Sequence, residues 1–359
     1  MSRVTFNNQN NQFFQSIKKK VEEYFREKNL KTTGNFKLYL KTLILIPFAI
    51  SMYILLLSST FPAFISIILC ALLGFTMASI GFNVMHDANH GSYSTKKWIN
   101  NLLGLSANCM GINAFIWRQK HNIIHHTYPN VDGIDDDIAK MPLLRQCPSQ
   151  KYLKMHRYQH IYCVPLYGLT SLLWTFLTDF IKYFSRKIHN TPIRNMELKE
   201  HLIFWFSKIL YIFFYIALPV KILGFASFII GFLILHIALG LTLAMVFQLA
   251  HVVEDTHFVN ANNSEMKIEN EWAIFQVQTT ANFATKNKFI SWFVGGLNYQ
   301  VEHHLFPRIS HVHYPVISKF VEETCEMFGL RYINYPTMTK ALESHFRFMK
   351  QLGSTGQLS

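Results

Sequence analysis

Two long apolar stretches dominate the pattern of hydrophobic and polar positions along the chain. The first, from Thr42 to Met85, has 44 residues without a Lys, Arg, Asp, Glu or His. A membrane-spanning helix needs about 20 apolar residues, so this stretch is long enough for two, with a turn near Pro62. The second stretch, Ile209 to Gln248, contains only Lys221 and His236 as ionisable residues. The pattern therefore predicts four spans in two hairpins, at about 40–59, 63–85, 203–220 and 225–248.

The positive charges predict how these spans are oriented. Eight Lys and Arg residues precede position 38, whereas the first expected turn has none and the second has only Lys221. Cytoplasmic loops are enriched in Lys and Arg, so both termini and the central region are expected in the cytoplasm. No signal peptide is expected, because the first 36 residues contain no apolar core segment. We expect three parts: a cytoplasmic N-terminal segment 1–37, a membrane domain 38–328 and a cytoplasmic C-terminal tail 329–359.

The N-terminal segment has the pattern of an amphipathic helix. Its apolar residues at helical spacing, beside the basic run Lys18 to Lys20, are Phe13, Phe14, Ile17, Val21, Tyr24 and Phe25. Such a helix can lie on an anionic membrane surface or pack on the cytoplasmic part of the protein. The pattern favours neither alternative.

The composition fits a membrane protein and excludes several other classes. Half of the residues are apolar and 15% are charged, against about 25% charged in typical globular proteins. Five cysteines without a CxxC spacing suggest neither a disulfide framework nor a zinc knuckle. The net charge of +13 is explained by the basic cytoplasmic segments, so we expect the lipid bilayer and no nucleic acid as a partner.

Eight of the 17 histidines gather at four places in the sequence. They are His86 and His90, then His121, His125 and His126, then His251, and finally His303 and His304. An i, i+4 spacing places two imidazoles on one helix face, and grouped imidazoles near a membrane are costly unless something binds their lone pairs. A transition metal does so, but eight ligands exceed the four of one tetrahedral zinc. The histidines therefore predict an open, oxygen-reactive site with two metals.

All ligands of one site must lie on the same side of the membrane. His86 and His90 follow the second span and His251 follows the fourth, which places all three on the cytoplasmic side. One further crossing would move a histidine group to the opposite side, so the uncharged stretches Trp98–Trp117 and Ile161–Thr178 are expected to be re-entrant or interfacial. The predicted fold class is an all-α membrane protein, in which a cytoplasmic helical cap on the two hairpins holds the histidine-rich di-metal site.

Polar residues beside the histidines are candidates for supporting the metal ligands. A carboxylate can accept the second N–H of a metal-bound imidazole and fix its tautomer. The candidates are Asp87, Asn89, Glu254, Asp255 and Glu302, each of which can also be a solvated group near a helix end. Asp135–Asp137 is expected to be a solvated acidic turn after Gly133; the alternative is that it holds the second histidine group or contacts the substrate. Isolated histidines are expected to be surface or satisfied core residues, namely His156, His189, His201, His236, His311, His313 and His345.

At these positions the sequence resembles the integral-membrane fatty acyl desaturases, a family of histidine-box di-iron enzymes. His86–His90 matches the HxxxH box, His121–His126 the HxxxHH box and Gln300–His304 the QxxHH box. The resemblance covers about Leu38 to Phe328 and implies that the eight histidines hold two iron ions, with O2 as co-substrate. Gln300 stands where many relatives have a ninth histidine; it could bind iron directly, act through a water or only shape the site.

The resemblance also implies a reaction and its partners. Gln300 resembles the front-end branch, which inserts a cis double bond between an existing one and the carboxyl end of an acyl chain carried by coenzyme A or a lipid. The sequence lacks the His-Pro-Gly-Gly motif of a fused cytochrome b5 domain, so a separate electron donor of the ferredoxin or cytochrome b5 type is expected. Candidates for lining an acyl tunnel are Trp117, Phe247, Trp272 and Phe275. The expected location is a bacterial plasma membrane, with the site on its cytoplasmic face; an endoplasmic reticulum membrane is the open alternative.

Two other functions compete with desaturation as explanations of the histidine pattern. A di-iron hydroxylase or other lipid oxygenase on the same scaffold would share every histidine, so this alternative stays open. A membrane transporter is disfavoured, because the ionisable groups cluster beyond the ends of the spans rather than near the midplane.

Overall fold

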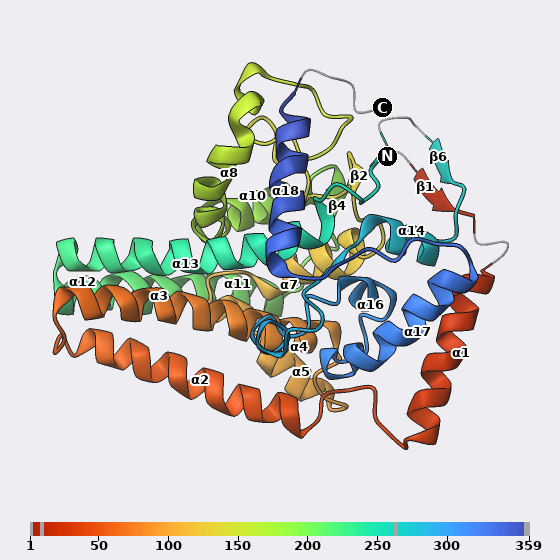
Figure 1. Ribbon diagram of the computed structural model, residues 1–359. Coiled ribbons are helices and arrows are strands. Elements are labelled where there is room, and N and C mark those ends of the chain that lie inside the picture. Colours follow the sequence, from red (N-terminus) through yellow and green to blue (C-terminus); the bar gives the residue numbers. More distant parts are fainter. Residues whose placement is uncertain (1–2, 8–10, 262–264, 355–359) are drawn as a thin grey trace.

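The computed structural model describes residues 3–7, 11–261 and 265–354, and these residues are mainly helical (Figure 1). Four stretches are helical, long and apolar enough to cross a membrane: Phe36–Leu57, Ala63–His90, Leu198–Leu223 and Phe225–His251. The first is α2 and the last is α13; the second joins α3 (Ala63–Ile80), η2 (Gly81–Met85) and α4 (His86–His90), and the third joins α11 (Leu198–Ile212), η6 (Phe213–Ala217) and α12 (Leu218–Leu223). The predicted number of candidate spans is confirmed, with ends that differ by a few residues.

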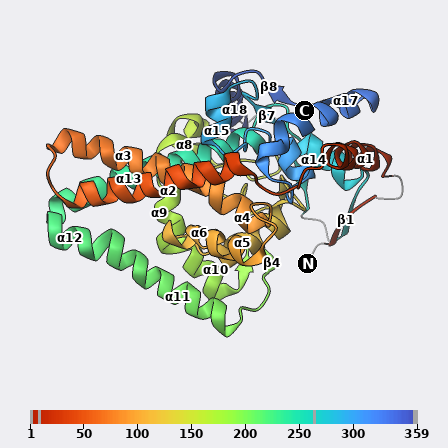
Figure 2. The same cartoon turned by 90° about the horizontal axis from the view of Figure 1, so that it is seen from below.

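The long helices run side by side and project from one side of the molecule (Figures 1 and 2). α3 packs against both α2 and α13. Its close approach to α13 depends on Gly74, because a Cβ there would lie 2.4 Å from the carbonyl oxygen of Leu235. Between α12 and α13 the chain turns at Gly224, whose φ of +75° favours a residue without a Cβ.

The two uncharged stretches between the long helices form shorter elements. Trp98–Trp117 lies in α5 (Lys97–Gly104), α6 (Ser106–Cys109) and α7 (Ala114–Arg118), each of which is too short to cross a bilayer. Ile161–Thr178 lies in α8 (Gln159–Gly168), α9 (Thr170–Leu173) and η5 (Trp174–Thr178), which continues into α10 (Asp179–Ser185). The chain bends by 58° between Gly168 and Thr170, which is the geometry of a broken span or a re-entrant segment.

Both terminal segments pack on the rest of the protein. The apolar face of α1 (Gln12–Glu27) buries Phe13, Ile17, Val21 and Phe25 against α14 (Trp272–Thr279) and α17 (Tyr314–Met327). Of the two alternatives for this amphipathic helix, packing on protein is therefore the one observed. At the other end, α18 (Met338–Leu352) packs against α8 and α13.

The remaining elements are short and surround the histidines. The helical ones are η3 (Gln119–His125), η4 (Lys154–Tyr158), α15 (Lys288–Phe293), α16 (Gln300–Leu305) and η7 (His311–His313). The strands form four two-stranded ladders: β1 (Arg3–Phe6) with β6 (Glu265–Ile268), β2 (Val131–Asp132) with β5 (Val259–Asn260), β3 (Lys187–Ile188) with β4 (Thr191–Pro192), and β7 (Asn282–Phe283) with β8 (Asn334–Tyr335). Among the described residues, only the β3–β4 ladder, which closes a short local turn, is antiparallel; the other three join segments that are distant in sequence. The ladders are two to four residues long, so the fold is mainly helical, as predicted.

Candidate metal centre

Four segments bring the eight predicted histidines together. α4 carries His86 and His90 one helical turn apart, and the other histidines lie on η3 and the residue after it, at the end of α13 and on α16. η3 is a π-helical segment, in which the N–H of His126 bonds to the carbonyl of His121 at 3.0 Å. This wider turn brings the Nε2 atoms of His121 and His126 within 3.3 Å of each other. Short π-helical segments often occur at functional sites.

The ring nitrogens converge into two groups. Within each group, one ligand atom from every residue lies within 4.8 Å of the others; the first group is His86, His90, His121 and His303, and the second is His125, His251 and His304. His126 lies between them, with ring centroids 4.5 Å from His303 and 4.6 Å from His304. Seven of the eight residues are buried, and His90 is partly exposed.

In four of the histidines, Nδ1 faces away from the centre of the cluster and lies beside an oxygen that orients the ring. Nδ1 of His125 lies 3.2 Å from a carboxylate oxygen of Asp135, and Nδ1 of His304 lies 2.8 Å from Oε1 of Gln276. His251 and His303 make comparable contacts, to the carbonyl oxygen of Thr279 and the hydroxyl of Tyr314. An acceptor at Nδ1 fixes the hydrogen there and leaves the Nε2 lone pair free for a metal.

The inward-facing nitrogens provide the test of whether metal ions fit. Five Nε2 atoms are buried without a hydrogen-bond partner among the described residues, those of His90, His125, His251, His303 and His304. Buried polar atoms are rarely left unpaired, because desolvation without a partner is costly. Imidazole nitrogen is a common ligand of iron, copper, nickel and zinc. The cluster therefore fits transition-metal ions.

The protonation state of the cluster also suits metal binding. Burial and the neighbouring imidazoles lower the pKa of His121, His126, His303 and His304 well below the ordinary value. The rings are therefore neutral at physiological pH, and a neutral ring has the lone pair that a metal needs.

The sequence prediction missed the role of Asp135. It expected a solvated acidic turn, whereas Asp135 is 1% exposed and accepts from His125, as the alternative proposed. Its neighbours Asp136 and Asp137 form ion pairs with Lys120, and Asp136 also pairs with Lys182. Burial of this turn is possible because the lysines neutralise its charge.

Asp87 is the acidic candidate nearest to its histidine. Its Oδ1 lies 3.9 Å from Nδ1 of His86, too far for a hydrogen bond. Its Oδ2 accepts from Ser310 at 2.7 Å and lies 3.0 Å from Nδ1 of His311. His311, expected to be an isolated histidine, is thus connected to the cluster through Asp87. Lys41 of α2 lies 3.2 Å from its other nitrogen.

The other predicted supporting residues bond elsewhere, which corrects the expectation that they accept from the histidines. Asn89 accepts from Arg118, and Glu302 accepts from Asn282 and Tyr332. Glu254 pairs with Arg347, and Asp255 pairs with Arg331. Gln300 donates to the carbonyl of Leu297 at 2.8 Å.

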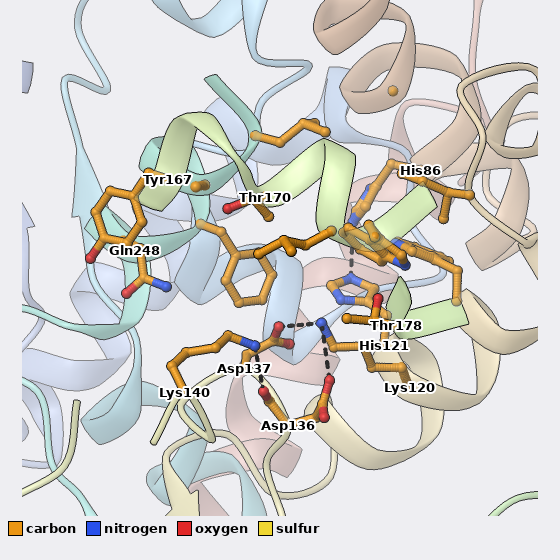
Figure 3. Close-up of a pocket in the computed structure, with 18 of the residues that line it drawn as sticks. His86, Lys120, His121, Asp136, Asp137, Lys140, Tyr167, Thr170, Thr178 and Gln248 are labelled. Carbon is orange, nitrogen blue, oxygen red and sulfur yellow. Dashed lines mark hydrogen bonds and ion pairs between the residues drawn. The ribbon is translucent and has the colours of Figure 1, made fainter. Parts of the chain in front are cut away.

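A cavity of about 260 Å³ adjoins the cluster (Figure 3). His86, His121, Gln300 and His303 form part of its wall, so a ligand inside would reach the first group of histidines. Two predicted lining residues, Trp117 and Phe247, also face it. The other two correct the prediction, since Trp272 instead donates to the carbonyl of His126 and Phe275 packs in a separate apolar cluster.

One side of the cavity is charged, and the rest is mostly apolar. Figure 3 shows Lys120, Asp136, Asp137 and Lys140 along this side. Burial raises the pKa of Asp136, but the positive charges of Lys140, Lys182 and Lys120 together lower it by more than burial raises it. The pKa of Asp136 therefore lies below its usual range. This carboxylate therefore remains charged and paired.

Apolar helices of spanning length and a buried histidine cluster define a helical membrane protein with a site suited to metal ions. Residues 60–336 match the sequence profile of the fatty acid desaturase family, and the chain belongs to that family. It is 37% identical over 95% of both chains to an sn-1 linoleoyl-lipid 6-desaturase from Synechocystis sp.. A second such enzyme, from Arthrospira platensis, is 34% identical over 98% of this chain and 95% of its own. An acyl-lipid (8-3)-desaturase from Physcomitrium patens is 36% identical over 97% of this chain and 73% of its own. The protein is thus an oxidoreductase, a membrane fatty acid desaturase.

Proposed function

We propose that this desaturase inserts a cis double bond into the acyl chain of a membrane lipid, using O2 and two iron ions. The observation that carries the proposal is the convergence of buried, unpartnered Nε2 atoms on two centres. Iron, among the metals that imidazole suits, is proposed because the three histidine boxes resemble those of the di-iron desaturases.

The histidine groups divide between the two ions. His86, His90, His121 and His303 would hold one, and His125, His251 and His304 would hold the other, with His126 placed to serve either. When bound, the irons supply the oxidising power that unactivated methylene C–H bonds require. The O2 is reduced to two waters by two electrons from the substrate and two from the donor.

The surrounding residues orient the ligands and restrict water. Asp135 and Gln276 hold the Nδ1 hydrogens of His125 and His304. The ring of Trp117 lies 4.4 Å from His121, and that of Phe247 lies 4.9 Å from His125, as measured between centroids. These apolar covers exclude water beside the reacting methylenes, and Gln300 shapes the wall of the same cavity.

The substrate and its orientation are further parts of the proposal. The relatives are named as desaturases of linoleoyl lipid and acyl lipid, which supports an acyl lipid rather than acyl coenzyme A. The glutamine at the head of the third histidine box and the names of these relatives support front-end regioselectivity. A cavity with a mostly apolar wall suits a hydrocarbon chain.

The membrane arrangement is proposed from the charges and the order of the spans. The four long helices would form two hairpins within the membrane domain 38–328, and the histidine-bearing segments would form a cap on the cytoplasmic face of a bacterial plasma membrane. The terminal segments 1–37 and 329–359 would lie on the same side. A separate ferredoxin or cytochrome b5 type protein would deliver electrons there.

Iron content and products together test the proposal. A host that expresses the chain should produce a lipid acyl chain two mass units lighter, and the purified protein should contain about two irons per chain. H304A and H125A should abolish activity and lower iron content, while membrane insertion stays intact. A product sixteen mass units heavier would instead identify a hydroxylase, and wild-type turnover in either variant would contradict the assigned ligand.

A further inference from the structure

Polar side chains interrupt the apolar wall of the cavity at the end away from His86 and His121 (Figure 3). Two of them, Tyr167 of α8 and Gln248 of α13, lie next to each other in the picture. The third, Gln146, comes from the loop that precedes α8. Gln146 is fully buried and Gln248 is 6% exposed, so these are not ordinary surface residues.

The hydrogen bonds of the two amides are incomplete. Gln146 donates from Nε2 to Oε1 of Gln248 at 2.8 Å. The Oε1 atom of Gln146 is buried without a partner among the described residues. No hydrogen bond from Nε2 of Gln248 occurs within the same part of the chain, although this amide forms part of the cavity wall. An amide held in this way is ready to donate to a ligand in the cavity.

The tautomer of His345 shows that Tyr167 cannot take this role. Nδ1 of His345 lies 2.7 Å from the carbonyl oxygen of Val252, which can only accept, so the hydrogen is on Nδ1. Nε2 is then an acceptor, and the Tyr167 hydroxyl 3.1 Å away donates its only hydrogen to it. The amide of Gln146 contacts both Gln248 and the Tyr167 hydroxyl. Of the three polar groups, Gln248 is therefore the one with hydrogens to offer the cavity.

The uncharged amide pair favours a ligand whose hydrogen-bond acceptor is also uncharged. A free carboxylate beside the two amides would lose its hydration without gaining an opposite charge from either of them. The carbonyl of an ester or thioester is uncharged, so it loses much less hydration free energy when buried, and it needs only one or two N–H donors. We propose that Gln248, held by Gln146, binds the carbonyl oxygen of an esterified acyl chain whose methylenes extend to the histidine cluster. This inference rests on the proposed desaturase function.

The position of Gln248 on α13 sets the distance between the bound carbonyl and the metal ligands. Gln248 lies three residues before His251 on α13, which corresponds to about 4.5 Å along the helix axis. A rigid helix keeps this offset constant, so the amide fixes how many carbons separate the carbonyl from the oxidised bond. The double bond should therefore stand at a constant distance from the carboxyl end, whatever the length of the chain.

The test compares double-bond positions in lipids made by the full-length protein. In a host supplied with acyl chains of three lengths, the wild type should desaturate all of them at the same distance from the carbonyl. Q146L/Q248L replaces both partners with apolar side chains of similar size, which keeps the fold and the iron content. It should give a mixture of positional isomers and raise the apparent KM for acyl lipid about fivefold, as expected for one lost hydrogen bond.

Three single variants test which side chain of the cavity wall holds the carbonyl. Q248N keeps an amide but withdraws it by one methylene, so it should also give a mixture of isomers with wild-type iron. Y167F should keep the wild-type position, because its hydroxyl donates to His345. K140Q should also keep the wild-type position; if the cavity instead binds a free carboxylate, K140Q is the sensitive variant and the proposal fails.

Two further results would overturn the proposal. The first is a single wild-type isomer at wild-type KM from both Q146L/Q248L and Q248N. The second is a double bond that keeps its distance from the methyl end as chain length varies. Failure of the iron-loaded wild type to desaturate any acyl chain would instead refute the proposed function.

Discussion

Replacing Asp135 with Asn should weaken iron binding through a single buried contact. The two carboxylate oxygens lie 3.2 and 3.3 Å from Nδ1 of His125, and each also accepts a backbone N–H at 3.0 Å, from Asn130 or Asp137. In D135N one oxygen becomes an NH2 group, so whichever way the amide turns, a backbone N–H faces another donor. Loss of a hydrogen bond to a charged group costs about 1.5–3 kcal/mol.

The D135N variant should have a measurably lower affinity for iron. Removing a group that supports a metal ligand typically weakens binding about 10-fold to 100-fold, which matches the hydrogen-bond cost because about 1.4 kcal/mol corresponds to a factor of ten. The assay is iron retained per chain against increasing chelator. D132N is the matched control, because Asp132 is also buried and accepts from Ser149 and Gln150 but from no histidine. Equal iron retention by D135N and wild type would refute the reasoning.

Two other predictions concern stability and are measured as thermal unfolding midpoints in detergent. In G240A the new Cβ would lie 2.6 Å from the carbonyl oxygen of Gly168, so α13 must move from α8 at a cost of about 1–3 kcal/mol. G231A should cost less, because its Cβ approaches only a side-chain sulfur, at 3.0 Å. K208M leaves the buried Asp179, 2.9 Å from the lysine, without its cation and should cost about 3–5 kcal/mol. K208M/D179L should recover part of that loss, because it removes the unpaired charge but leaves the N–H of Asn113 without its acceptor; a double variant as unstable as K208M would contradict this account.

Local sequence pattern predicted the spans because the bilayer imposes a simple rule. Backbone groups in hydrocarbon must bond within their own segment, so a spanning segment is a long apolar helix. Thr42–Met85 and Ile209–Gln248 satisfied that rule on composition alone. The packing of α1 was not predictable in the same way, because an amphipathic face suits a membrane surface and a protein surface equally.

Local pattern also identified the eight histidines but not most of the groups that support them. The spacing of His121, His125 and His126 is visible in the sequence. The role of Asp135 was hidden, since an acidic run is normally solvated and here becomes buried through lysines of two other segments. Asp87 was found, but its partner His311 lies 224 positions further along the chain and carries no motif.

By itself, the sequence determined the number of apolar helices and the kind of ligand available, because both depend on residue type and short spacing. Only the tertiary structure decided that the histidines divide into two groups, which oxygens lie beside Nδ1 in four of the rings, and that Gln146 and Gln248 meet in one wall. The physical reason is that a buried polar group must find its partner among whatever segments packing brings beside it, and for Gln146 and Gln248 that partner is 102 residues away.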